Sequence, residues 1–122
     1  MTDKIYRILA ADDDPTMGLM FRAVLGAPRF ELSYVVDGEA AWAAYRQGGH
    51  FDLVLLDVEM PVVDGLQVAE LIRRSEPELP IVLLTGREDP RFREALANLS
   101  ARHLPKPVNW AALPGRLLAW IV

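Results

Sequence analysis

Residues 52–65, DLVLLDVEMPVVDG, decide the fold. The apolar run at 53–56 does not alternate with polar residues, which is typical of a strand covered on both faces, as in a parallel sheet. The run ends on a single acid, Asp57, and a turn follows. Residues 81–84 (IVLL) show the same pattern and end at Thr85. The sequence therefore predicts a buried parallel sheet with polar groups at the ends of its strands.

Strand-like and helix-like segments alternate along the whole chain. Apolar residues recur at helical spacing between the strand-like runs, as in Met17, Met20, Phe21 and Val24. Asp14 and Asp89 each precede a proline, and Asp37 and Asp64 each precede a glycine, so all four mark helix starts. The last helix either begins near Pro114 or is kinked there. The expected strands are 6–11, 31–36, 53–56, 81–84 and 102–104.

Five strand–helix repeats predict an α/β domain. Its sheet would be open, parallel, five-stranded and doubly wound, with helices on both faces. The 122 residues suffice for one domain, 1–122, and the content of 52% hydrophobic and 25% charged residues is ordinary for a globular protein. Cysteine is absent, which excludes disulfides and thiolate metal sites and fits a reducing compartment. A net charge of −4 predicts no nucleic-acid surface. The polar N-terminus predicts no signal peptide and no membrane contact, so we expect a cytoplasmic protein.

Polar groups follow four of the five expected strands. Asp12 and Asp13 follow the first strand, Asp57 the third, Thr85 the fourth and Lys106 the fifth. In a doubly wound sheet, ligands bind beyond the carboxyl ends of the strands, so these side chains should converge. Each motif alone could be a capped turn or a solvated side chain, but together they indicate a site.

This set of residues suits phosphoryl transfer. Clustered carboxylates repel one another unless a cation is present, and Mg²⁺ (or Mn²⁺) prefers oxygen ligands. An ionised Asp57 could then act as a nucleophile and form an aspartyl phosphate. The Thr85 hydroxyl and the Lys106 ammonium could each hold a phosphoryl oxygen.

The motifs ILAADDDP, LVLLDVEMPVVDG, IVLLTG and LPKP, in this order, resemble the receiver domains of bacterial two-component response regulators, the CheY-like superfamily. The resemblance spans the whole chain and implies the flavodoxin-like strand order 2-1-3-4-5. It implies that Asp57 is the phospho-acceptor and that Asp13 and Asp57 bind Mg²⁺ directly. It further implies that Asp12 acts through water and that the backbone carbonyl of Glu59 is a ligand.

The resemblance assigns roles to the other strand ends as well. Thr85 would be the switch hydroxyl, Gly86 would leave room for the phosphoryl group, and Lys106 would pair with it. The Lys106–Pro107 peptide would be cis. His103 stands where receivers usually carry Tyr or Phe, so we expect weaker or pH-sensitive switching.

Two further residues flank the expected phosphorylation site. Glu59 and Arg87 lie two residues after Asp57 and Thr85 at positions that tune phosphoryl lifetime in this family. We expect both to hinder attacking water and to lengthen that lifetime.

The resemblance also implies partners. A sensor histidine kinase or a phosphotransfer protein would donate the phosphoryl group, because neither His50 nor His103 suits that role. An output domain or effector protein would receive the signal, and the fourth helix, fifth strand and fifth helix could form a homodimer face. The chain would not be an enzyme in the ordinary sense, because phosphorylation consumes it.

Three alternatives stay open. A small haloacid-dehalogenase-like phosphatase would also use an aspartyl phosphate, and Asp57-Val58-Glu59 faintly resembles its nucleophile motif. A flavodoxin-like cofactor binder would need a phosphate cradle where Asp12, Asp13 and Asp14 stand, and acids there would repel the phosphate. A degenerate receiver that is never phosphorylated would be expected to have lost site residues, and all five are present.

Overall fold

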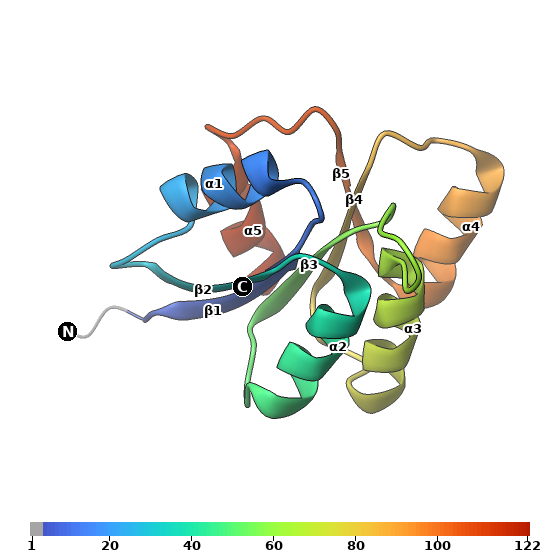
Figure 1. Ribbon diagram of the computed structural model, residues 1–122, viewed down its shortest axis with the longest axis horizontal. Helices are drawn as coiled ribbons and strands as arrows, with labels where there is room; N and C mark the ends of the chain where they lie inside the picture. The colour runs from blue at the N-terminus through green and yellow to red at the C-terminus, as the bar shows by residue number, and fades with distance from the viewer. Residues whose placement is uncertain (1–3) are drawn as a thin grey trace.

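One parallel sheet of five strands, in the order β2-β1-β3-β4-β5, forms the centre of the protein. The computed structural model describes residues 4–122 (Figure 1). This strand order matches the order 2-1-3-4-5 that the resemblance implied. Along the chain, the elements are β1 (Tyr6–Ala11), α1 (Pro15–Val24), β2 (Phe30–Val35), α2 (Gly38–Gln47), β3 (Leu53–Asp57), α3 (Gly65–Ser75), β4 (Ile81–Thr85), α4 (Pro90–Leu99), β5 (Arg102–Pro105) and α5 (Leu113–Ile121).

The predicted strands lie within one residue of the observed ones. β3 and β4 each continue one residue beyond the apolar run, so Asp57 and Thr85 are the last residues of their strands. Both strands are buried throughout. The register pairs Asp57 with Leu84, and Thr85 pairs with Pro105 on β5.

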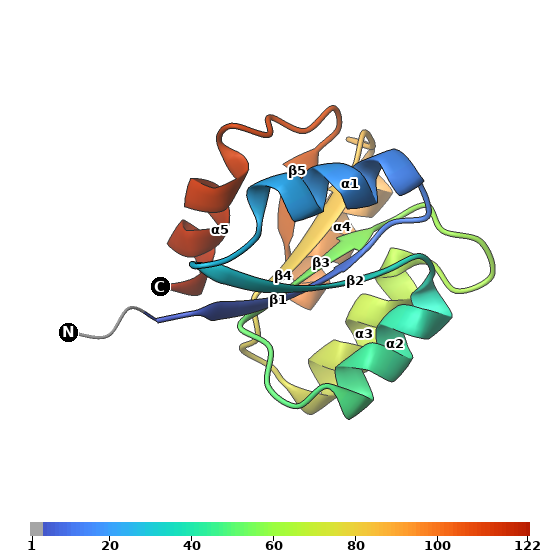
Figure 2. The same ribbon diagram turned by 60° about the vertical axis from the view of Figure 1, so that its left-hand side comes forward.

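Helices cover both faces of the sheet, as expected (Figure 2). Successive strand residues point to opposite faces, so each strand contributes to two separate cores. Leu9, Val54 and Leu83 pack under α2, α3 and α4. The alternating residues, such as Ile8 and Leu55, pack under α1 and α5.

The handedness of the strand connections explains this division. β2 lies on one side of β1, and β3, β4 and β5 follow on the other side. Because crossovers between parallel strands are right-handed, α1 falls on one face and α2, α3 and α4 on the other. The direction reverses between β1 and β3, and the crevice at such a reversal is where doubly wound sheets bind ligands.

Acidic side chains cap four helices at their predicted starts. Asp14, Asp37, Asp64 and Asp89 each accept a hydrogen bond from a backbone N–H in the first turn. α5 has no side-chain cap, and Pro114 lies in its first turn. The last helix therefore begins at Leu113, directly before the proline, and is not kinked by it.

Aromatic packing and a left-handed residue complete the C-terminal half. Trp110 precedes α5 and packs edge-on against Phe21 of α1, with ring centroids 5.4 Å apart. Ser100 follows the last residue of α4, has φ 51° and closes the turn at a position where a glycine is usual. Arg73 of α3 donates to the carbonyl of Leu99, so a neighbouring helix supplies the cation that α4 lacks in its last turn.

No helix within residues 4–122 is both long and apolar enough to cross a membrane.

Candidate phosphoryl and metal site

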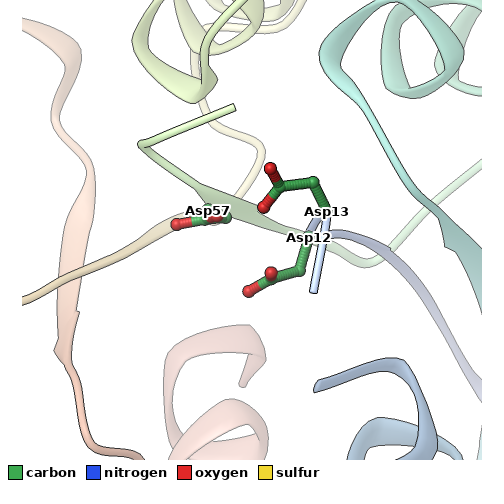
Figure 3. A group of neighbouring side chains, drawn as sticks. All are labelled: Asp12, Asp13 and Asp57. Carbon is green, nitrogen blue, oxygen red and sulfur yellow. The ribbon is translucent and has the colours of Figure 1, made fainter. Parts of the chain in front are cut away.

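Three carboxylates meet beyond the carboxyl ends of β1 and β3 (Figure 3). Asp12 and Asp13 follow β1, and Asp57 ends β3 on the neighbouring strand. Each side chain offers an oxygen, and these three oxygens lie within 4.8 Å of one another. Asp12 and Asp57 are buried, whereas Asp13 is exposed. The fold thus forces together acids that would repel each other in water.

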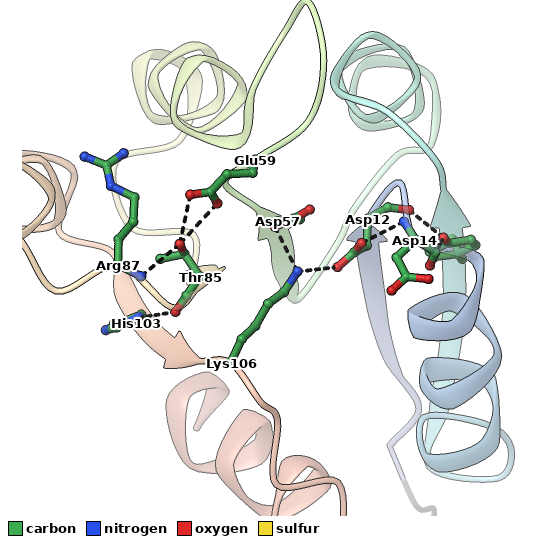
Figure 4. A network of polar contacts seen from close by, with 9 residues as sticks. Asp12, Asp14, Asp57, Glu59, Thr85, Arg87, His103 and Lys106 are labelled. Carbon is green, nitrogen blue, oxygen red and sulfur yellow. Dashed lines mark hydrogen bonds and ion pairs between the residues drawn. The ribbon is translucent and has the colours of Figure 1, made fainter.

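Lys106 reaches this group from the end of β5 (Figure 4). Its Nζ lies 3.1 Å from Asp57 Oδ1 and 3.3 Å from Asp12 Oδ2. The following peptide, Lys106–Pro107, is cis, as the resemblance implied. The lysine therefore supplies one positive charge between two buried carboxylates.

The positive charge of Lys106 offsets only part of the cost of burying the Asp12 and Asp57 carboxylates. Burial raises the pKa of Asp57 to about 6, the negative charge of Asp12 acts in the same direction, and the Lys106 ammonium opposes both. Burial likewise raises the pKa of Asp12, against the Asp14 N–H and Lys106. Burial alone would lower the pKa of Lys106, but its two carboxylate partners raise it above the ordinary value.

The donor set fits a divalent cation. Asp12 Oδ2 is buried and has no hydrogen-bond donor aligned with it among the described residues, although Lys106 stands 3.3 Å away. A buried carboxylate oxygen without a hydrogen bond is costly, so it calls for a further positive partner. Three carboxylates suit Mg²⁺ or Mn²⁺, which take oxygen ligands.

Thr85 ends β4 on the other side of Asp57 (Figure 4). It is buried, and its hydroxyl donates toward both carboxylate oxygens of Glu59, at 3.2 and 3.1 Å. The backbone N–H of Arg87 donates back to the Thr85 hydroxyl at 3.1 Å. The Arg87 side chain binds Asp89, the cap of α4, through two hydrogen bonds.

Two neighbours of Thr85 also lie where the sequence predicted them. A Cβ added to Gly86 would meet only the Lys106 carbonyl, at 3.9 Å, so this side of the site is open. His103 Nε2 lies 2.9 Å from the Thr85 carbonyl oxygen, and its ring packs edge-on against Phe92. The His103 side chain thus contacts the backbone of Thr85.

All nine predicted residues gather at this edge of the sheet. Eight of them line a pocket of about 450 Å³, and the ninth, His103, contacts the lining residue Thr85. The lining residues are Asp12, Asp13, Asp14, Asp57, Glu59, Thr85, Gly86, Arg87 and Lys106.

One contributor had no sequence signal. Tyr34 of β2 donates its hydroxyl to the carbonyl of Asp12 and so holds the loop that carries the acids. Gly18 of α1 makes room for this ring, because a Cβ there would lie 2.6 Å from it. A tyrosine within an expected strand gives no reason to predict this role.

A fold of this topology, with acids, a hydroxyl and a lysine at its strand ends, defines the receiver class. Residues 8–117 match the family described as Response regulator receiver domain. The chain belongs to this family.

Curated relatives support the assignment. Over 114 residues, 93% of this chain, it is 36% identical to the transcriptional regulatory protein TcrA of Mycobacterium tuberculosis, and it spans 45% of that protein. Over 98% of its own length, it is 34% identical to the sensor protein GacS of Pseudomonas syringae, and it spans 14% of that protein. The chain thus matches less than half of the length of each relative.

Solved structures show the same fold. The non-phosphorylated HemR receiver domain of Leptospira biflexa has a TM-score of 0.85 at 30% identity, covering 95% of this chain and 94% of that one. The chemotaxis response regulator CheY4 of Vibrio cholerae has a TM-score of 0.85 at 27% identity, covering 96% and 99%. These comparisons do not favour the haloacid-dehalogenase alternative.

Proposed function

We propose that this receiver domain accepts a phosphoryl group on Asp57 and changes conformation in response. One observation carries the proposal: the ammonium of Lys106 lies 3.1 Å from the carboxylate of a buried strand-end aspartate, beside two further acids. Burying an ionisable carboxylate costs free energy, and carboxylates with perturbed pKa values cluster at functional sites. The burial of Asp57 therefore supports a functional role for it.

The proposed reaction transfers a phosphoryl group from a histidine of the donor protein to Asp57. A carboxylate oxygen of Asp57 attacks the phosphorus of the donor's phosphohistidine, the P–N bond breaks, and the imidazole nitrogen leaves with the electron pair and takes up a proton from water. The transferred group carries negative charge on three oxygens. Lys106 is placed to neutralise one of them, and the Thr85 hydroxyl can donate to another.

A divalent ion, Mg²⁺ or Mn²⁺, would be held by this chain's oxygens. Asp13 and Asp57 would be direct ligands, Asp12 would act through water, and Glu59 would contribute its backbone carbonyl. When bound, the ion supplies positive charge that offsets the repulsion between the carboxylates and polarises the phosphoryl oxygens.

Switching follows from contacts that exist only after phosphorylation. Thr85 and Lys106 would both bind the phosphoryl group, and this differential binding shifts the equilibrium between two conformations. His103, which contacts the Thr85 carbonyl, would move with it. Glu59 and Arg87 flank the site and would slow the access of water, so we expect a phosphoryl lifetime well beyond seconds.

The partners follow from the family. Relatives of this chain include a sensor protein and transcriptional regulatory proteins. We propose a sensor histidine kinase or phosphotransfer protein as the donor and an output domain or effector protein as the recipient, in the cytoplasm. The face formed by α4, β5 and α5 is the proposed homodimer surface. The chain would catalyse only its own phosphorylation and dephosphorylation.

Intact-mass spectrometry tests the proposal. Protein incubated with acetyl phosphate and Mg²⁺ should gain one phosphoryl group, and Asp57→Asn protein should gain none. Turnover of a phosphate ester without stoichiometric labelling would instead support the phosphatase alternative.

A further inference from the structure

The Thr85 hydroxyl already has an acceptor in this structure. Its Oγ1 lies 3.2 and 3.1 Å from the two carboxylate oxygens of Glu59 (Figure 4). A hydroxyl has a single proton to donate. While the Thr85 hydroxyl donates its hydrogen bond to Glu59, it cannot donate one to a phosphoryl oxygen.

Burial makes this contact important. Thr85 is 1% exposed, so solvent does not reach it freely. Within residues 4–122, the Glu59 carboxylate is the one acceptor toward which the hydroxyl donates. The Arg87 N–H occupies a lone pair of the same oxygen and so fixes its position. A buried hydroxyl without an acceptor is unfavourable, so the Glu59 contact stabilises the resting position of Thr85.

Glu59 can also give up this contact. It is exposed and lies two residues beyond Asp57, in the loop after β3. Its carboxylate can therefore return to water at little cost, and a phosphoryl group on Asp57 would repel it.

We propose that Glu59 is a positioning residue that holds the Thr85 hydroxyl in the unphosphorylated chain, in competition with the phosphoryl group. The inference rests on the proposed function and adds a resting state to it. Phosphorylation then has to separate Thr85 from Glu59, so the Glu59 side chain lowers the affinity of the site for a phosphoryl group. A ligand that binds one of two states better shifts the balance between them, and Glu59 biases that balance toward rest.

Beryllofluoride with Mg²⁺, a mimic of the phosphoryl group, tests the competition by titration calorimetry. Glu59→Ala should tighten beryllofluoride binding about tenfold, which equals about 1.4 kcal/mol. Glu59→Gln should tighten it less, because the amide oxygen still accepts. Glu94→Gln, on the exposed face of α4, removes a charge elsewhere and should change binding little.

A double-mutant cycle with Thr85→Val separates the hydroxyl from the charge of Glu59. Valine keeps the shape of threonine without the hydroxyl, so Glu59→Ala should gain only about threefold or less in that background, the share due to charge repulsion. In the native background, Glu59→Ala should also shift the NMR signal of the Thr85 methyl group. Thermal unfolding checks that each variant is folded.

Two outcomes would overturn this inference and leave the proposed function intact. An equal gain in the native and Thr85→Val backgrounds would show that Glu59 acts through charge, and no gain in either would show that it does not compete. If the native chain bound no beryllofluoride and Asp57→Asn made no difference, the proposed function would fail and the inference with it.

Discussion

Replacing Asp57 with asparagine should stabilise the metal-free protein at neutral pH. Asp57 is 2% exposed, and its burial, together with the charge of Asp12, raises the pKa of its carboxyl group to about 6 from an ordinary 3.8. The folded protein therefore binds this proton more tightly than the unfolded chain does. Asparagine has the size of a protonated aspartate and never ionises, so it removes the cost of the buried charge.

The shift in pKa sets the magnitude and the pH window. One pKa unit corresponds to about 1.36 kcal/mol, so two units amount to about 3 kcal/mol in favour of the variant. Because the pKa of Asp57 is raised on folding, the proton stabilises the fold fully below pH 3.8, and that stabilisation is lost as the pH rises through about 6. The gain from Asp57→Asn should be near zero at about pH 3.5, grow between about pH 4 and 6, and level off above about pH 7.

Urea unfolding followed by tryptophan fluorescence measures this gain. The experiment is run in a chelator at several pH values, with Glu94→Gln as a variant that removes an exposed charge. Adding Mg²⁺ should narrow the difference, since an ion at about ten times its dissociation constant adds about 1.4 kcal/mol to the protein that binds it. A variant that is less stable than the native chain at neutral pH, or a gain that does not vary with pH, would refute the reasoning.

Three further substitutions test other parts of the structure by the same unfolding assay. Lys106→Met should lower the free energy of unfolding by about 1–2 kcal/mol at neutral pH, because two buried carboxylates lose a cation that is itself 31% exposed. An unchanged free energy of unfolding would mean that the lysine does not compensate the carboxylates. Arg73→Ala should cost about 2–3 kcal/mol because its guanidinium donates to two carbonyls of the segment after α3 and to the carbonyl that ends α4. Arg74→Ala, at the exposed neighbouring residue, should cost little, and equal effects of the two changes would contradict this. Gly65→Ala should destabilise the protein strongly, because the added Cβ would clash with the carbonyl oxygen that ends β3. Gly86→Ala should be tolerated, because its Cβ would meet only a carbonyl oxygen at 3.9 Å, and tolerance of both changes would disprove the steric argument.

The strands and the site residues could be predicted because their signals are local. Apolar runs at 53–56 and 81–84 mark buried strands, and an acid or a hydroxyl directly after such a run must lie at the carboxyl edge of the sheet. Aspartates before proline or glycine fixed the helix starts for the same reason.

Contacts between side chains distant in the sequence could not be predicted in this way. The hydrogen bond from Thr85 to Glu59 joins residues 26 apart, and the Tyr34 hydroxyl reaches the Asp12 carbonyl across 22 residues. Both depend on the rotamers and register of neighbouring strands, which periodicity does not encode. Pro114 left two alternatives open, since proline is compatible with a helix start and with a kink.

Reductive trapping tests the central claim most directly. Protein treated with acetyl phosphate and Mg²⁺ is reduced with borohydride, which converts an aspartyl phosphate into homoserine, and peptide mass spectrometry then locates the converted residue. The account predicts homoserine at position 57, its loss in Asp57→Asn, and an unchanged aspartate at positions 12 and 13. Conversion at position 12 or 13, or none at position 57, would contradict it.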